Sequence, residues 1–421
     1  MSVPGRRATL RASLPWLCGL IAAGMALRNL WSAPGDLGIY LEAARELGAG
    51  GHDLYRQRAT PPYPYPHVFL LPLRGLQILL PDRGIVILWS LGLGLATSLL
   101  LADLSRAMRA FGGLSAAQWA LFGFLFQRTI AQNLTHGQAS LWVAALMLRA
   151  TLALMESRQR SSGLMLGTAA AIKLTPSAYL AALPLMRAGR AALWTLLALC
   201  GLVFLLPWPF LGEEHWRHLA DFHRAMIAPL FDGSLKFAVR DHQGPGIAGT
   251  LDYLLQKRPI GDDGRVIAVL DLGDEALSVA KLVYSAAIAL LLWAGFASAH
   301  RLDGGRRIPS QSAIVMLAIA FFSPHANVYH LAGAALPFAM FCLGALGPAP
   351  GVRRGLLWWT AAIGFACSLT LRQKKLVGET LWRGLSDYGV LHVSLVLLTL
   401  WLVSWIRGAA AKSGTPLPAA S

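Results

Sequence analysis

Apolar stretches of membrane-spanning length recur along the whole chain, and they limit the folds open to it. Hydrophobic residues make up 55% of the 421 residues, and charged residues only 14%, against about 25% in soluble domains. A soluble enzyme and a disordered chain are therefore excluded. A spanning helix needs about 20 apolar residues, so eleven helices would use roughly half the chain. We predict an all-α polytopic membrane protein with about 11–12 transmembrane or re-entrant helices.

The net charge of +16 is distributed as in a membrane protein and not as in a nucleic-acid-binding protein. Segments that we assign to the inner side hold 16 Lys/Arg and two acids, at 1–13, 105–113, 156–162, 187–190, 300–307, 348–354 and 407–421. Outer segments 34–83, 212–275 and 372–388 hold 16 Lys/Arg and 18 Asp/Glu. This is the positive-inside pattern. It predicts a multi-pass protein of the plasma (inner) membrane with both termini in the cytoplasm and no nucleic-acid partner.

Neither the cysteines nor the histidines show the spacing of a metal site. His215, His218 and His223 do not share one helical face. The four cysteines all lie in apolar stretches, at Cys18, Cys200, Cys342 and Cys367. We therefore predict no metal and no cofactor.

We predict one membrane domain over residues 1–421, with outer loops at about 34–83 and 211–275. The segment 161–187 has basic residues at both ends but too few apolar residues for two full spans. We expect a broken hairpin that turns at Lys173-Leu-Thr-Pro176, with Thr175 as an N-cap. Lys173 then either binds phosphate with Thr175 at a helix N-terminus or extends to the membrane surface from a simple kink.

Asp36 directly follows the first apolar stretch and precedes an amphipathic helix predicted over 37–47. Leu37, Tyr40 and Leu41 fall on the apolar face of that helix, which we expect along the membrane surface. Asp36 is either its N-cap or a general base at the membrane boundary.

Polar residues near the other outer helix ends complete the candidate site. Tyr65, between Pro64 and Pro66, is placed to stack on a sugar ring. Arg128 offers a fork of donors to a phosphate, and Gln138 follows in NLTHGQASLW. His325 and His330 flank the outer turn SPHANVYH. The alternative for Tyr65 is a rigid loop that re-enters the membrane, and for Arg128 and Gln138 it is polar capping of two helix ends. The two histidines would otherwise be ordinary hydrogen-bonded polar residues.

Together these stretches resemble the GT-C membrane glycosyltransferases, and specifically glycosyltransferase family 87. The matching pieces span residues 36–338 and begin with DLGIYLEAARELGAGGHDLY and YPYPHVFLLPL. They continue with HGQASLWVAALML, SGLMLGTAAAIKLTPSAYLAALPLM and SPHANVYHLAGAALPF.

The resemblance implies a GT-C fold and sugar transfer, with mannose as the expected sugar, from a polyprenyl-phosphate donor. The acceptor would be a hydroxyl of an envelope glycolipid or glycan on the outer face. It also implies that Asp36 is the catalytic base, with Lys173 and Arg128 at the donor phosphate. The chain departs from the family where it has Tyr329-His330-Leu331 and Asp241-His242-Gln243-Gly244. Gln243 and His330 are nevertheless kept as candidate substrate-binding residues.

Two other functions compete with an inverting glycosyltransferase. A lipid-linked sugar flippase or transporter usually carries acids within its spans, whereas Asp103 is the one acid in a predicted span here. A noncatalytic scaffold subunit would tolerate changes at Asp36 and Lys173.

Overall fold

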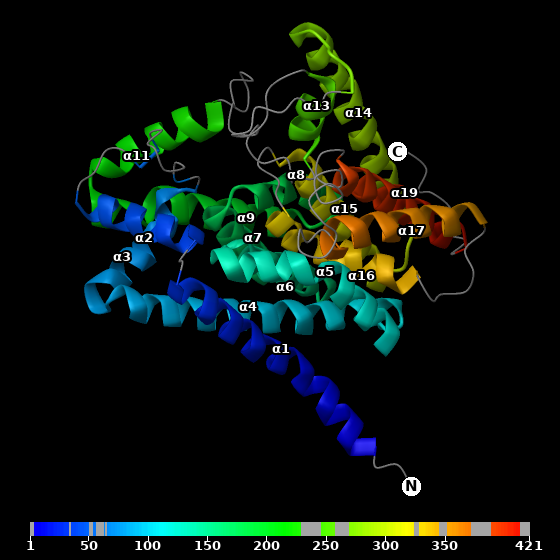
Figure 1. Cartoon of the computed structure of the whole chain (residues 1–421), viewed down its shortest axis with the longest axis horizontal. Coiled ribbons are helices and arrows are strands. Elements are labelled where there is room, and N and C mark those ends of the chain that lie inside the picture. Colours follow the sequence, from blue (N-terminus) through cyan, green and yellow to red (C-terminus); the bar gives the residue numbers. More distant parts are fainter. Residues whose placement is uncertain are drawn as a thin grey trace. The chain divides into compact units, whose positions relative to one another are not determined.

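A computed structural model gives the architecture of the chain. It describes residues 4–32, 35–49, 54–55, 63, 65–228, 246–256, 269–323, 328–344, 352–371 and 389–412. All regular structure in these ranges is helical, and Figure 1 shows the helices coloured along the chain.

The chain groups into two compact units, residues 1–103 with 130–235 and residues 104–129 with 236–421. Helices α4 (Asp82–Met108) and α5 (Ala116–His136) contribute to both units. The first unit also contains α1 (Pro4–Ser32), α2 (Gly35–Gly48), η1 (His67–Phe69), α3 (Leu70–Leu79), α6 (Ser140–Met155), α7 (Gln159–Ile172), η3 (Thr175–Ser177), α8 (Ala178–Leu185), α9 (Gly189–Cys200), η4 (Gly201–Leu205), α10 (Trp208–Leu211), α11 (Glu214–Phe222) and η5 (His223–Ile227). The second contains η2 (Arg109–Phe111), α13 (Ile247–Leu255), α14 (Asp274–Ala299), α15 (Gly304–Phe322), η7 (Val328–Ala334), α16 (Ala335–Gly344), α17 (Val352–Phe365), η8 (Ala366–Leu371) and α19 (Val390–Lys412). The single domain over 1–421 stays a prediction.

Four helical stretches among the described residues are long and apolar enough to cross a membrane, at Asp82–Phe111, Gly189–Leu211, Asp274–Ala299 and Val390–Lys412. Shorter apolar helices accompany them, such as Ser140–Met155. The protein is an all-α polytopic membrane protein, as its composition predicted. The GT-C arrangement and the larger number of spans remain predictions.

In the first unit, α7 packs against both α6 and α9, and these three helices run side by side in Figure 1. The contact with α9 depends on a glycine. A Cβ added at Gly167 would lie 2.5 Å from Ala198 Cβ and 2.7 Å from the Thr195 carbonyl oxygen. A small residue at such a position lets two helix backbones approach closely. The close contact fixes α7 just before it ends at Lys173.

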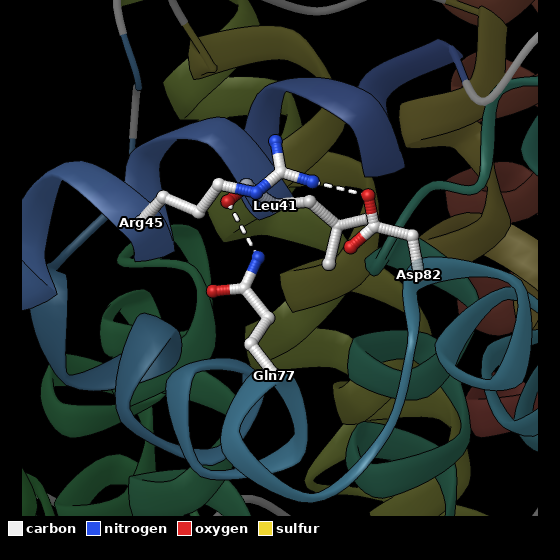
Figure 2. A network of polar contacts seen from close by, with 4 residues as sticks. All are labelled: Leu41, Arg45, Gln77 and Asp82. Atoms are coloured by element: carbon white, nitrogen blue, oxygen red, sulfur yellow. Dashed lines mark hydrogen bonds and ion pairs between the residues drawn. The ribbon is translucent and has the colours of Figure 1, made fainter.

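Helix α2 forms over Gly35–Gly48, and its predicted apolar face is buried. This face packs against α3 and the neighbouring aromatic side chains. The position of α2 along the membrane surface stays a prediction. Polar contacts at its edge tie α2 to its neighbours (Figure 2). Gln77 Nε2 donates to the Leu41 carbonyl oxygen at 2.8 Å, and Arg45 pairs with Asp82 at the start of α4.

Helix α3 was not predicted, because four prolines stand between residues 61 and 66 and a fifth, Pro72, lies within the helix. Pro72 is the third residue of this helix. The first four N–H groups of an α-helix have no partner within it, so a proline in the first turn costs no hydrogen bond. The proline-rich segment therefore continues into a helix.

In the second unit, α19 packs against both α14 and α17. The Trp401 ring meets the Phe341 ring edge-on, with centroids 5.5 Å apart. A Cβ at Gly344 would lie only 2.1 Å from the Trp401 ring. Gly344 therefore makes room for the largest fully buried side chain of this unit.

Candidate functional site

Asp36 lies in the first turn of α2 and is half-buried. The preceding Gly35 has a φ of +54°, and a Cβ there would lie 2.9 Å from the His136 carbonyl oxygen. Only glycine combines this backbone conformation with so close a contact. Because α2 already includes Gly35, Asp36 is within the helix and is not its N-cap. Asp36 therefore lies in the first turn, where the helix N-terminus favours its negative charge.

The turn between α5 and α6 contacts the α1–α2 junction from the other side. Gly137 has a φ of +66°, and a Cβ there would lie 3.0 Å from both Leu30 and Leu37. The indole N–H of Trp89 donates to the Gly137 carbonyl oxygen at 3.0 Å. Backbone contacts therefore hold Asp36 and the residue after this turn, Gln138, in one fixed arrangement.

Gln138 accepts hydrogen bonds from two tyrosines. Its Oε1 receives the Tyr65 hydroxyl at 3.2 Å and the Tyr40 hydroxyl at 3.4 Å. The Tyr40 ring also lies edge-on to the rings of Phe69, at 5.3 Å, and Trp89, at 6.1 Å between centroids. The side chains of Tyr40, Tyr65 and Gln138 are all buried. Tyr40, Tyr65, Phe69 and Trp89 thus form an aromatic wall. Gln138 fixes the orientation of its two hydroxyl groups.

Lys173 joins this wall from α7. The chain is extended at Lys173 (φ −148°, ψ 122°), and the Lys173 N–H makes the last helical bond, to the Ala169 carbonyl oxygen. The Lys173 ammonium donates to Ser140 Oγ at 3.2 Å and lies 5.6 Å from the centre of the Tyr65 ring. The half-buried ammonium is thus held by a hydroxyl group and by a cation–π contact.

Two opposing effects act on the proton affinity of Asp36. Burial raises its pKa, while the nearby charges of His136 and Lys173 act to lower it, and the net pKa is raised. A carboxylate that holds a proton more firmly than a free aspartate is a better general base. The arrangement combines this base with a fixed cation.

The structure brings together some predicted site residues and leaves others apart or outside its range. Tyr65, Gln138 and Lys173 contact one another directly or through a shared partner, and Asp36 lies within electrostatic reach of Lys173. Arg128 and His330 are half-buried in the second unit. His325 and Gln243 lie outside the described residues.

The role predicted for Thr175 as a helix cap is wrong. Leu174 occupies the N-cap position of η3, and the structure shows no side-chain capping bond there. Helix α8 directly follows this short 3₁₀ turn, in which Pro176 takes an early position. The broken hairpin over 161–187 stays a prediction. Thr175 as a phosphate ligand stays a prediction.

Sequence reasoning missed Ser140 and the polar role of Tyr40. Tyr40 was assigned to an apolar face, which is where its ring lies, but its hydroxyl bonds Gln138. Ser140 comes two residues after Gln138, at the start of α6. A hydroxyl so close to a predicted site residue was the available signal.

Comparison with known families gives a match over more than half of the chain. Residues 63–324 match glycosyltransferase family 87. Searches of curated proteins and of solved structures gave no match. The matched range contains Tyr65, Gln138 and Lys173, while Asp36 precedes it. The chain belongs to glycosyltransferase family 87 and is a membrane glycosyltransferase.

Proposed function

We propose that this protein transfers a sugar from a polyprenyl-phosphate donor to a hydroxyl group of an envelope glycolipid or glycan, with inversion at the anomeric carbon. The observation that carries the proposal is the pairing of a half-buried carboxylate with a fixed ammonium group beside an aromatic wall. Asp36 and Lys173 supply opposite charges within electrostatic reach of each other. A GT-C fold, as the family resemblance implies, would present this site at the outer membrane face.

In the proposed reaction, Asp36 takes the proton of the acceptor hydroxyl. The acceptor oxygen then bonds the anomeric carbon on the face opposite the phosphate. The bond from that carbon to the phosphate oxygen breaks, and the lipid phosphate leaves with the electron pair. Lys173 stabilises the departing negative charge, and Ser140 and Tyr65 hold its ammonium in place.

The proposed donor explains the chemistry of the neighbouring side chains. A phosphate leaving group calls for a cation, and a sugar ring packs well on aromatic side chains. Tyr65 and Gln138 would contact the sugar from the buried wall. Mannose is the sugar that the family resemblance favours. Arg128, Thr175, His325, His330 and Gln243 remain candidate binding residues.

The test compares sugar transfer by wild type, Asp36→Asn and the control Glu42→Gln in purified, correctly inserted protein. Glu42 is an exposed acid on the same helix. The donor is radiolabelled polyprenyl-phosphate mannose and the acceptor is an envelope extract. We expect product from wild type and Glu42→Gln and none from Asp36→Asn. Wild-type transfer by Asp36→Asn would refute the assignment of the base.

The same variants, measured for sugar transfer and for movement of the lipid-linked sugar across a vesicle membrane, test the two competing functions. A flippase would move the lipid-linked sugar between leaflets of a vesicle without forming a glycosidic product. If the protein were a noncatalytic scaffold subunit, the activity of its partner enzyme would be unchanged in the Asp36→Asn and Lys173→Met variants. Either result, with folded protein, would overturn the proposed function.

A further inference from the structure

Three histidines are buried together in the first unit, next to the candidate site. His67, His215 and His218 expose 0%, 0% and 2% of their surface. His67 Nε2 lies 2.8 Å from His215 Nδ1, and the ring centroids of His67 and His218 are 5.5 Å apart. Among the described residues, no three His, Cys, Asp or Glu side chains are placed to hold a metal. The cluster therefore needs another explanation.

The hydrogen bonds fix where the protons lie. His215 Nε2 is 3.0 Å from the Phe204 carbonyl oxygen, which can only accept, so this nitrogen carries a proton. A neutral His215 then offers a lone pair at Nδ1, and His67 Nε2 donates to it. A neutral His67 is left with a bare Nδ1, which is buried and has no hydrogen-bond partner.

The local sequence explains why the Phe204 carbonyl is open to His215. Phe204 lies in the π-helical turn η4, where hydrogen bonds join residues five apart. Five residues after Phe204 stands Pro209, which has no N–H to donate. The carbonyl oxygen therefore accepts its hydrogen bond from a side chain of α11, His215.

The hydrogen-bonded chain connects α11 to the tyrosines of the site. The Tyr55 hydroxyl donates to the Tyr65 carbonyl oxygen at 3.1 Å, and it also receives a backbone hydrogen bond from His67. At the other end of α11, the Phe222 ring packs on Tyr55 with centroids 5.4 Å apart. Beneath the histidines, Val68 packs with Ala171 of α7 and Val203 of η4. Tyr65 is thus held beside Lys173 by a segment that α11 covers.

We propose that His67 and His215 form a proton-operated latch, which when neutral holds α11 on the segment carrying Tyr65 and His67, and which a single added proton opens.

An added proton finds no acceptor on the His67–His215 pair. On His67 Nδ1 it would make a buried cation without a partner. A proton added to His215 Nδ1 would place two N–H groups against each other where His67 Nε2 now donates to His215 Nδ1. If His67 then moved its own proton to Nδ1, that buried N–H would have no acceptor. Burial and the two neighbouring histidines accordingly lower the pKa of His67 to about 3, and burial lowers the pKa of His215.

The groups facing the latch do not offset this cost. On α11, Asp221 pairs with Arg224 at 2.7 Å and Glu214 with Arg217 at 2.6 Å. Before the segment that carries Tyr65 and His67, Tyr55 contributes an uncharged hydroxyl group. Helix η4 contributes the Phe204 carbonyl oxygen. His67 and His215 are neutral in the closed latch and become charged below pH 6.5 when the latch is open. The closed latch is therefore most stable above pH 6.5. Its stability is then lost progressively as the pH falls from 6.5 toward 3.

The experiment follows amide hydrogen exchange of peptides covering 65–69 and 214–222 in the full-length protein in lipid nanodiscs, between pH 7.5 and 5. After correction for intrinsic exchange, we expect opening to increase at least tenfold per pH unit below about pH 6.5, the slope for one proton, and more steeply where both histidines gain a proton on opening. The peptide Ser140–Met155 should not change. Uniform exchange across all three peptides, or no change at all, would overturn the latch.

Two matched variants keep the test sharp. In His67→Gln the amide can donate to a neutral His215 or, by rotating, accept from a protonated one, so opening should lose its pH dependence. His223→Gln changes an exposed histidine at the end of the same helix and should behave as wild type. Acid opening that persists in His67→Gln, or disappears in His223→Gln, refutes the assignment.

The activity readout rests on the proposed function, whereas the exchange readout does not. If the latch positions Tyr65, sugar transfer should fall at acid pH more steeply in wild type than in His67→Gln. Loss of acid opening in His67→Gln, with no transfer by any protein, would retain the latch and contradict the proposed function.

Discussion

Placing a methyl group at Gly167 should separate α7 from α9 and disturb Lys173. An added Cβ would meet Ala198 Cβ at 2.5 Å, the Thr195 carbonyl oxygen at 2.7 Å and the Leu199 nitrogen at 3.0 Å. Carbon atoms pack best at about 3.5–4.0 Å, so the helices must move apart by about 1 Å. Two of these contacts are with backbone atoms, which cannot rotate away.

The size of the effect follows from two opposing terms. Overpacking costs about 1–3 kcal/mol, and the backbone contacts favour the upper end of that range. Replacing glycine by alanine inside a helix returns about 1 kcal/mol. The net loss for Gly167→Ala is therefore about 2 kcal/mol. In a unit of this size the midpoint of thermal unfolding should fall by about 4–8 °C.

Thermal unfolding in detergent, followed by size-exclusion chromatography of the surviving protein, measures this shift. Gly201→Ala is the control, because Gly201 continues the same helix path after α9 and nothing lies within 4 Å of its added Cβ. Gly201→Ala should be as stable as wild type or slightly more so. The reasoning is refuted if Gly167→Ala unfolds at the same temperature as Gly201→Ala.

Three further predictions concern the site and its support. Ser140→Ala should lower kcat/KM about tenfold by removing a hydrogen bond to the Lys173 ammonium; Ser90→Ala, which removes only a bond to the Val86 carbonyl of its own helix, should not. Asp82→Asn breaks an exposed ion pair with Arg45 and should lower the free energy of unfolding by less than about 1 kcal/mol. A fall in thermal midpoint as large as the one expected for Gly167→Ala would contradict the structure. Because the pKa of Asp36 is raised above 3.8, transfer should decline on acidification at a midpoint above that value in His67→Gln protein, and an acid limb at or below 3.8 would exclude Asp36 as the base.

The fold class could be predicted because lipid solvation leaves a strong signal in the sequence. Apolar length and basic flanks predicted the path of α4 and α14, and the Lys-Leu-Thr-Pro stretch predicted where the helical path breaks after α7. These features depend on local composition alone. Helix α3 was missed because Pro72 reads as a helix breaker, and its position within a first turn is known only once the helix start is known.

Within the site, residue types could be predicted but their partners could not. Lys173 and Tyr65 were selected for their chemistry, yet their contact depends on how α7 meets the proline-rich segment. Ser140 and the hydroxyl of Tyr40 escaped notice because each lies in an otherwise apolar stretch. The histidine cluster depends on His67 and His215, which are 148 residues apart, and no local spacing encodes that contact.

The backbone contacts at Gly35 and Gly137 mean that the cost of ordering the base is met during folding and not when substrate binds. Asp36 and Gln138 are anchored by main-chain atoms on either side of one junction, so neither needs to search for its position. Such preorganisation saves the entropy that a mobile site would lose at each turnover. An inhibitor shaped to the Asp36 carboxylate should therefore bind without waiting for a rearrangement, and its association rate should not saturate with concentration.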